Sequence, residues 1–248
     1  MTPPFLLQIR TGGEIKSSLK GIIRDVNNRF EVRRSGSRRD VPHATLFGPY
    51  DTNQGAQVKQ SVQEVLSRYH LVPYRISGFD RFEKKNVIFA DVEPSSELRS
   101  LRRDLSENLR PITHDQRPWD GNFCYDFHIT IAKAESTSEF EKIWEYVTDN
   151  YNPDFDTYAK RVTSLRGREM MWEWDVPRSE ELRQADATSE HTWEQTLAEL
   201  DRLKSMDGLD APSSQYGLRK LLFQNAVVRW TVWHARKLVS SLREAKNY

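Results

Sequence analysis

Strand-like and helix-like hydrophobic patterns alternate along the first 176 residues, and their order repeats once. The first copy predicts strands at residues 5–10, 41–47, 72–82 and 86–92, with helices that end near residues 30 and 69. The second copy predicts helices at 95–109 and 136–150 and strands at 122–133, 158–166 and 169–176. The copies are offset by about 85 residues, so we predict two similar β-α-β-α-β-β units.

This repeat predicts an α+β fold with two lobes related by a pseudo-twofold axis, whose antiparallel-rich sheets line a central groove. We expect one bilobal domain at residues 1–177, with halves at about 1–93 and 94–177. The pattern then changes, and residues 178–248 are expected to form a helical extension. Its first helix is an amphipathic segment at residues 189–205.

A second, longer helix of the extension is predicted at residues 216–246, where apolar residues recur with 3-4 spacing over more than three heptads. Asn225 is a polar position in this seam, and such a residue can fix the register of a coiled coil. One interpretation is therefore a homodimer formed through this helix. The other is that the helix packs on its own protein, and the width of its apolar face, which includes Trp230 and Trp233, favours this second interpretation.

Composition indicates a folded, soluble protein. The 248 residues include 11 Phe, 9 Tyr and 7 Trp, which argues against disorder. A single cysteine, Cys124, excludes an intrachain disulfide framework and a multi-cysteine zinc site. No apolar run approaches the roughly 18 residues that a membrane helix needs, and the amino-terminal sequence lacks the apolar core of a signal peptide. We therefore expect a cytoplasmic protein that does not enter a membrane.

The formal net charge of +1 conceals an uneven distribution. Residues 1–50 carry nine basic and four acidic side chains, and residues 201–248 carry the same numbers, whereas residues 101–200 are acidic. The loop at residues 31–40 holds four arginines, of which Arg38 and Arg39 lie next to the strand that follows. These arginines are solvated surface residues or, in the sharper interpretation, contacts for a polyanion such as RNA.

The two copies carry the same short motif on corresponding strands, His43-Ala-Thr45-Leu in the first and His128-Ile-Thr130-Ile in the second. Side chains alternate along a strand, so each histidine shares a face with its threonine while the apolar neighbours face the core. The pseudo-twofold axis brings both pairs to one groove. Two imidazoles and two hydroxyls at one site can supply a general acid, a general base and hydrogen-bond donors.

These motifs resemble those of the 2H phosphoesterases, the superfamily of 2′-5′ RNA ligase-like proteins and 2′,3′-cyclic nucleotide phosphodiesterases. The resemblance covers residues 5–176 and implies a bilobal fold, a central cleft and no metal or other cofactor. It implies that His43 and His128 are the acid and base, and that Thr45 and Thr130 bind phosphate oxygens. Lys133 falls where many members have a basic residue, but on a regular strand it faces away from His128 and reaches the groove only if the strand bulges or ends.

We therefore expect a phosphodiesterase that hydrolyses 2′,3′-cyclic phosphates or 2′-5′ links of RNA ends or nucleotides. His128 is expected to activate water and His43 to protonate the leaving oxygen. Phe47 shares the parity of His43 on a regular strand and is expected to stack on a base. Two alternatives stay open, a non-catalytic RNA-binding protein that uses the same groove and a 2′-5′ RNA ligase that runs the reverse reaction.

Overall fold

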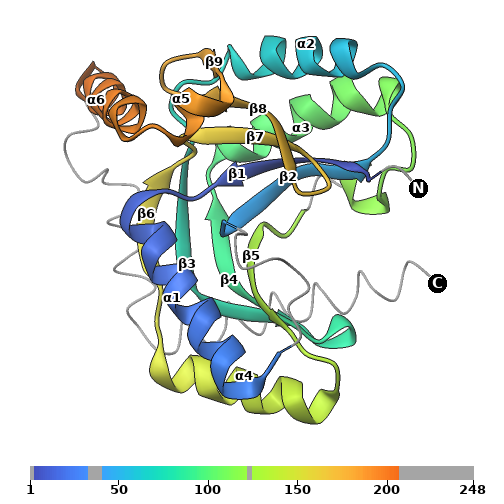
Figure 1. Cartoon of the computed structure of the whole chain (residues 1–248), viewed down its shortest axis with the longest axis vertical. Coiled ribbons are helices and arrows are strands. Elements are labelled where there is room, and N and C mark those ends of the chain that lie inside the picture. Colours follow the sequence, from blue (N-terminus) through green and yellow to red (C-terminus); the bar gives the residue numbers. More distant parts are fainter. Residues whose placement is uncertain (1–2, 33–40, 122–124, 207–248) are drawn as a thin grey trace. The chain divides into compact units, whose positions relative to one another are not determined.

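The computed structural model describes residues 3–32, 41–121 and 125–206 (Figure 1). The chain divides into two compact units, Met1–Leu200 and Asp201–Tyr248, and the fold below is that of the first unit. The strands are β1 (Phe5–Arg10), β2 (His43–Tyr50), β3 (Pro73–Phe82), β4 (Val87–Pro94), β5 (His128–Lys133), β6 (Asp154–Tyr158), β7 (Arg161–Arg166), β8 (Glu169–Asp175) and β9 (Glu180–Leu182). The helices are α1 (Gly13–Phe30), α2 (Gly55–Leu66), α3 (Ser96–Leu109), α4 (Thr137–Asn150), α5 (Gln184–Thr188) and α6 (Glu190–Met206).

The predicted α+β class and most of the predicted elements are confirmed. Side-chain caps set two helix starts, because the hydroxyl of Ser95 accepts a hydrogen bond from Leu98 N and that of Ser136 accepts one from Glu139 N, each at 3.2 Å. Two strands differ from the prediction. The one expected at 158–166 is divided between β6 and β7, and the one expected at 122–133 begins at His128.

The strands form two antiparallel sheets, and each sheet takes strands from both copies of the repeat. The five-stranded sheet has the order β2-β1-β7-β8-β9, and the four-stranded sheet has the order β5-β4-β3-β6. The hairpin of each copy is therefore in the sheet that holds the histidine strand of the other copy. The two lobes are built across the sequence halves, and not from one half each.

Helices cover the outer faces of both sheets (Figure 1). Helices α2 and α3 lie side by side, with α3 against β2 of the five-stranded sheet. Helix α4 packs on β3 and β4 of the four-stranded sheet and contacts α1. Because the helices bury one apolar face of each sheet, the opposite faces remain for polar side chains.

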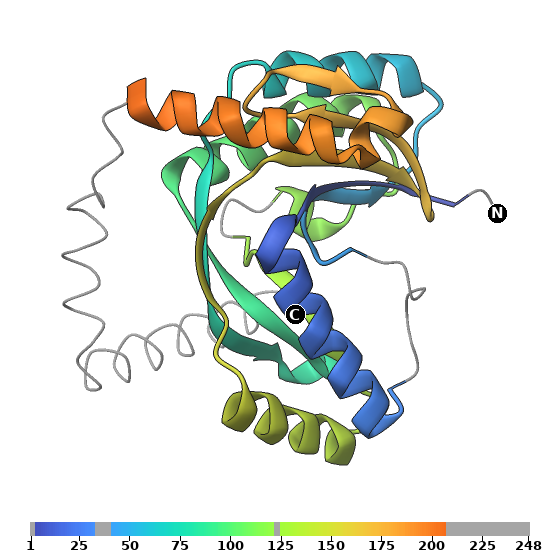
Figure 2. The same cartoon turned by 60° about the vertical axis from the view of Figure 1, so that its left-hand side comes forward.

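The boundary expected at residue 177 falls before β9, inside the unit that runs to Leu200. Figure 2 shows α6 lying across the five-stranded sheet. Trp193 of α6 packs on Gly12, where an added Cβ would lie 2.1 Å from the indole ring. A side chain at residue 12 would therefore displace Trp193. Among the described residues, no helix is both long and apolar enough to cross a membrane.

Candidate active site

The two histidine strands alternate as their sequences predict. In β2 the side chains of His43 and Thr45 are partly exposed, and the residues between and after them are buried. In β5 His128 is partly exposed and Thr130 is exposed, again with buried apolar neighbours. The alternation follows from the strand repeat of two residues. Strands β2 and β5 contact each other, although they belong to different sheets.

Each imidazole is held by the backbone carbonyl two residues before it. His43 Nδ1 lies 3.0 Å from Val41 O, and His128 Nδ1 lies 2.8 Å from Asp126 O. A carbonyl oxygen only accepts hydrogen bonds, so both Nδ1 atoms carry the proton. The second ring nitrogen, Nε2, is then the atom of each ring that is left for proton transfer.

His43 and His128 interact electrostatically, which places both rings at one site. Burial lowers the pKa of His128 below its usual value, and the positive charges of His43 and Lys85 lower it further. The backbone carbonyl and carboxylate of Asp126 act in the opposite direction but do not outweigh burial. A lowered pKa keeps His128 neutral near pH 7, which is the protonation state of a general base.

A β-bulge brings Lys133 to the face of His128. The register between β4 and β5 shifts by one residue at Ile131, so the residues beyond it change sides. The shift lies between the pairs Phe89–Thr130 and Ile88–Ala132. As a result Lys133, which is exposed, is on the side of His128 and Thr130. A regular strand would have turned it away.

The equivalent shift in β2 makes the prediction for Phe47 wrong. Here Leu46 is the extra residue, so Phe47 moves from the face of His43 to the core face. The shift lies between the pairs Gln8–Thr45 and Leu7–Phe47. Phe47 is fully buried and its ring lies 5.3 Å from that of Tyr50. It cannot stack on a substrate base.

Aromatic rings surround His128 instead. The ring centroids of Phe82 and Phe89 lie 5.1 and 5.2 Å from that of His128, and the ring of Tyr125 lies at 6.2 Å. The side chain of Tyr125 is hydrogen-bonded to Thr45. Tyr125 thus touches both motifs, a position that was not expected because the strand was predicted to begin before it.

Two further residues at this site, Lys85 and Trp119, were not expected from the sequence. Lys85 lies in the turn of the β3–β4 hairpin, near enough to His128 to lower the pKa of that ring. Its ammonium group is 5.1 Å from the ring centroid of Trp119, and Trp119 Nε1 donates to Gly48 O at 3.4 Å. Trp119 is 36% exposed, unusually high for so large an apolar side chain. Lys85 and Trp119 are far apart in the sequence, so no local pattern indicates that the hairpin turn and the loop at Trp119 come together.

Basic side chains of β1 and α1 interact electrostatically with one another. Arg10 pairs in register with His43, so its side chain starts on the face of that histidine. Burial lowers the pKa of Lys16, and the charges of Lys20 and Arg10 lower it further. The carboxylate of Glu173, which lies 3.1 Å from Arg10 Nη2, opposes this lowering and offsets the charge of Arg10.

Several expectations lie outside the described residues. These are the arginines of the 31–40 loop, including Arg38 and Arg39, and the helix at 216–246 through which a homodimer was considered. Within the described part of the chain, no group of three or more His, Cys, Asp or Glu side chains could hold a metal ion.

Residues 18–169 match the sequence model of the 2′-5′ RNA ligase superfamily. No curated protein sequence matches the chain. Among solved structures, E. coli LigT complexed with 3′-AMP is 16% identical, with 71% of this chain and 98% of LigT covered and a TM-score of 0.42. Kluyveromyces marxianus Usb1 is 11% identical, with 68% of this chain and 97% of Usb1 covered and a TM-score of 0.40. Because the matched segment spans more than half of the chain and contains both histidine strands, this protein belongs to the 2′-5′ RNA ligase superfamily of 2H phosphoesterases.

Proposed function

We propose that this protein is a metal-independent phosphodiesterase that hydrolyses 2′,3′-cyclic phosphates or 2′-5′ phosphodiester links at RNA ends or in nucleotides. The observation that carries the proposal is the matched pair of imidazoles. Both are held at Nδ1 by a backbone carbonyl, both keep Nε2 for proton transfer, and each shares a strand face with a threonine hydroxyl. Binding alone would need neither the matched tautomers nor two titratable rings.

In hydrolysis of a cyclic phosphate, His128 Nε2 takes a proton from water while the water oxygen forms a bond to phosphorus. The bond between phosphorus and one ribose oxygen breaks, and His43 Nε2 gives a proton to that oxygen. One proton is taken and one is given, so the products are a phosphomonoester and a free hydroxyl. The lowered pKa of His128 favours it as the base.

The surrounding side chains suit the charge that develops on phosphorus. Thr45 and Thr130 offer hydroxyl donors, and Lys133 offers an ammonium group on the same face as Thr130. Trp119 offers an exposed ring on which a base can stack, with Lys85 beside it for a phosphate. Losing either of these two contacts should raise KM more than it lowers kcat, since neither side chain transfers a proton.

The proposal is tested by incubating the full chain with a 2′,3′-cyclic mononucleotide in excess EDTA. We expect release of a nucleoside phosphomonoester, detected by chromatography, at the same rate with and without the chelator. Turnover that disappears in EDTA would contradict the metal-independent mechanism. Binding of RNA without turnover of a cyclic phosphate or a 2′-5′ link would favour the non-catalytic alternative, and joining of RNA ends would favour a ligase.

The pH dependence of kcat/KM should carry the signature of His128. Its folded-state pKa is below the ordinary 6.5. A base works only when deprotonated, so the rate should rise with pH through that pKa, and this acid limb should be centred below pH 6.5. Lys85→Met removes a positive charge that lowers the pKa, and it should move the limb to higher pH.

A pH–rate profile of the two proteins measures this shift. Lys59→Met is a matched control that removes the same charge. Lys59 lies on the outer helix α2, where it is paired with Glu181 of β9. A limb that stays in place or moves to lower pH in Lys85→Met would contradict the assignment of His128 as the base.

A further inference from the structure

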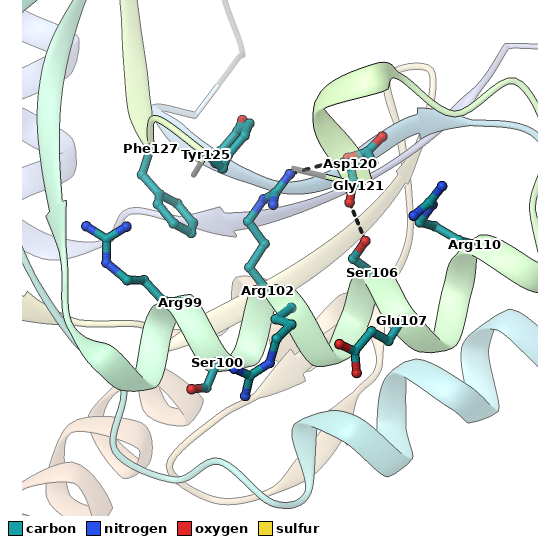
Figure 3. Close-up of a pocket in the computed structure, with 11 residues that line it drawn as sticks. Arg99, Ser100, Arg102, Ser106, Glu107, Arg110, Asp120, Gly121, Tyr125 and Phe127 are labelled. Atoms are coloured by element: carbon teal, nitrogen blue, oxygen red, sulfur yellow. Dashed lines mark hydrogen bonds and ion pairs between the residues drawn. The ribbon is translucent and has the colours of Figure 1, made fainter. Parts of the chain in front are cut away.

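A polar cavity lies beside α3, and neither histidine lines it. Figure 3 shows this pocket, which has a volume of about 290 Å³. Its charged lining residues are Arg99, Arg102, Arg103, Glu107, Arg110 and Asp120. Four guanidinium groups therefore face two carboxylates, and this excess of positive charge favours an anionic ligand.

The more deeply buried charges of the pocket are paired with the backbone and with each other. Asp120 is 1% exposed, and its carboxylate accepts hydrogen bonds from Gly48 N at 3.1 Å and Arg117 N at 3.2 Å. Arg102 is 4% exposed, donates to Trp119 O at 2.6 Å and lies 3.8 Å from a carboxylate oxygen of Asp120. The negative charge of Asp120 is thus offset within the protein.

The remaining arginines of the pocket are at its surface. Arg99, Arg103 and Arg110 are exposed, and the only exposed carboxylate that lines the pocket within the described residues is that of Glu107. Arg103 Nε lies 3.7 Å from Asp104. In the part of the chain that the structure describes, burial raises the pKa of Asp120 and the positive charge of Arg110 opposes this rise, whereas Arg99 has no carboxylate within ion-pair distance. Exposed guanidinium groups of this kind bind phosphate oxygens in bidentate geometry.

One aromatic ring separates this pocket from the histidine site. The guanidinium carbon of Arg102 lies 3.8 Å from the ring centroid of Tyr125, and the ring of His128 lies 6.2 Å from the same centroid. Tyr125 lines the pocket and is also hydrogen-bonded to Thr45. The ring of Tyr125 is therefore a wall that the pocket and the histidine site share.

We propose that the arginine pocket binds backbone phosphates of an RNA chain whose reacting end lies at His43 and His128. The inference rests on the proposed function, and it adds that the substrate is an oligonucleotide rather than a mononucleotide. Nearness to the histidines favours RNA over an unrelated anion, because one molecule then occupies both places. The guanidinium groups hold the chain by its phosphates, so the pocket selects for length and not for base sequence.

The test compares substrates of two lengths in the variant Arg99→Ala/Arg110→Ala. For a tetranucleotide ending in a 2′,3′-cyclic phosphate we expect KM to rise about 10-fold, as two charge-assisted contacts are lost. For a 2′,3′-cyclic mononucleotide KM should change less than about 2-fold. The slope of log KM against log salt for the tetranucleotide should fall by about 0.7 for each phosphate contact removed.

The control variant is Arg168→Ala/Arg183→Ala, which removes the same charge from two exposed arginines that do not line the pocket. It should leave both KM values unchanged. Both substituted pairs are exposed, so thermal unfolding should be the same in all three proteins. If the tetranucleotide KM rose equally in the control, the effect would come from the lower net charge and not from the pocket. That result would overturn the inference.

Fluorescence anisotropy with a labelled tetranucleotide carrying a 3′-phosphate separates this inference from the proposed function. Weaker binding to Arg99→Ala/Arg110→Ala supports the pocket even where no hydrolysis is seen, an outcome that contradicts only the proposed function. Normal mononucleotide turnover with unchanged tetranucleotide binding and KM in this variant overturns the pocket and leaves the proposed function intact.

Discussion

Substituting His43 or His128 with alanine should lower kcat for a 2′,3′-cyclic nucleotide by about 10²–10⁴-fold in each case. Either change removes one of the two proton transfers, and neither threonine can replace an imidazole near pH 7. Both histidines are partly exposed, so the variants should fold. Initial rates of phosphomonoester release, with circular dichroism as the check on folding, measure the effect.

His191→Ala is the matched control for these variants. His191 is exposed on α6, where its Nε2 lies 3.1 Å from Gln195 Nε2, and it should be replaced without loss of rate. The double variant His43→Ala/His128→Ala should be little slower than either single variant, because two groups that act in one step are not additive. Full activity of either single variant would exclude the two-histidine mechanism.

Local sequence predicted the helices and the orientation of the two motifs. The helix expected at 95–109 is α3 at Ser96–Leu109, and the helix expected at 136–150 is α4 at Thr137–Asn150. Periodicity and capping residues are local properties, so they can be recognised from the sequence without knowledge of the fold. The partly exposed histidines and threonines on strands with buried neighbours follow from the same local alternation.

Local sequence did not predict the β-bulges in β2 and β5. Parity counted along β2 places Phe47 with His43, and parity counted along β5 places Lys133 away from His128. Both positions are reversed by one extra residue after each threonine. A bulge is a property of the pairing between two strands, and the partner strands, β1 and β4, are more than 30 residues away in sequence.

The sequence also did not predict the contact of α6 with the five-stranded sheet, because that contact depends on residues far apart in the chain. Charged residues at alternate positions of β8, such as Glu173 and Asp175, are typical of a solvent-facing sheet surface. In the structure this face is covered, and Arg161, Glu173 and Asp175 are at most 1% exposed. Only the tertiary structure shows that α6 supplies partners to two of these charges. The hydroxyl of Thr196 bonds both Arg161 and Asp175, and Thr192 O accepts a hydrogen bond from Arg161.

Arg161→Met should therefore lower the free energy of unfolding by about 3–5 kcal/mol, because it leaves the buried carboxylate of Asp175 without its cation. Arg161 lies 3.6 Å from Asp175 and 3.7 Å from Glu173, and it donates to the hydroxyl of Thr196 at 2.6 Å. Burial already raises the pKa of Glu173, with Arg10, Thr163 and Arg161 opposing that rise. Urea-induced unfolding, followed by tryptophan fluorescence, measures the loss.

Two variants separate the missing charge from a missing contact. Thr196→Val removes the hydroxyl that bonds both Arg161 and Asp175, and should cost only about 1 kcal/mol. Arg161→Met/Asp175→Asn removes the unpaired carboxylate as well, and should recover part of the loss, because charges in contact are coupled. If Arg161→Met costs no more than Thr196→Val, or if the double variant is as unstable as the sum of its single changes, the ion cluster does not hold α6 to the sheet.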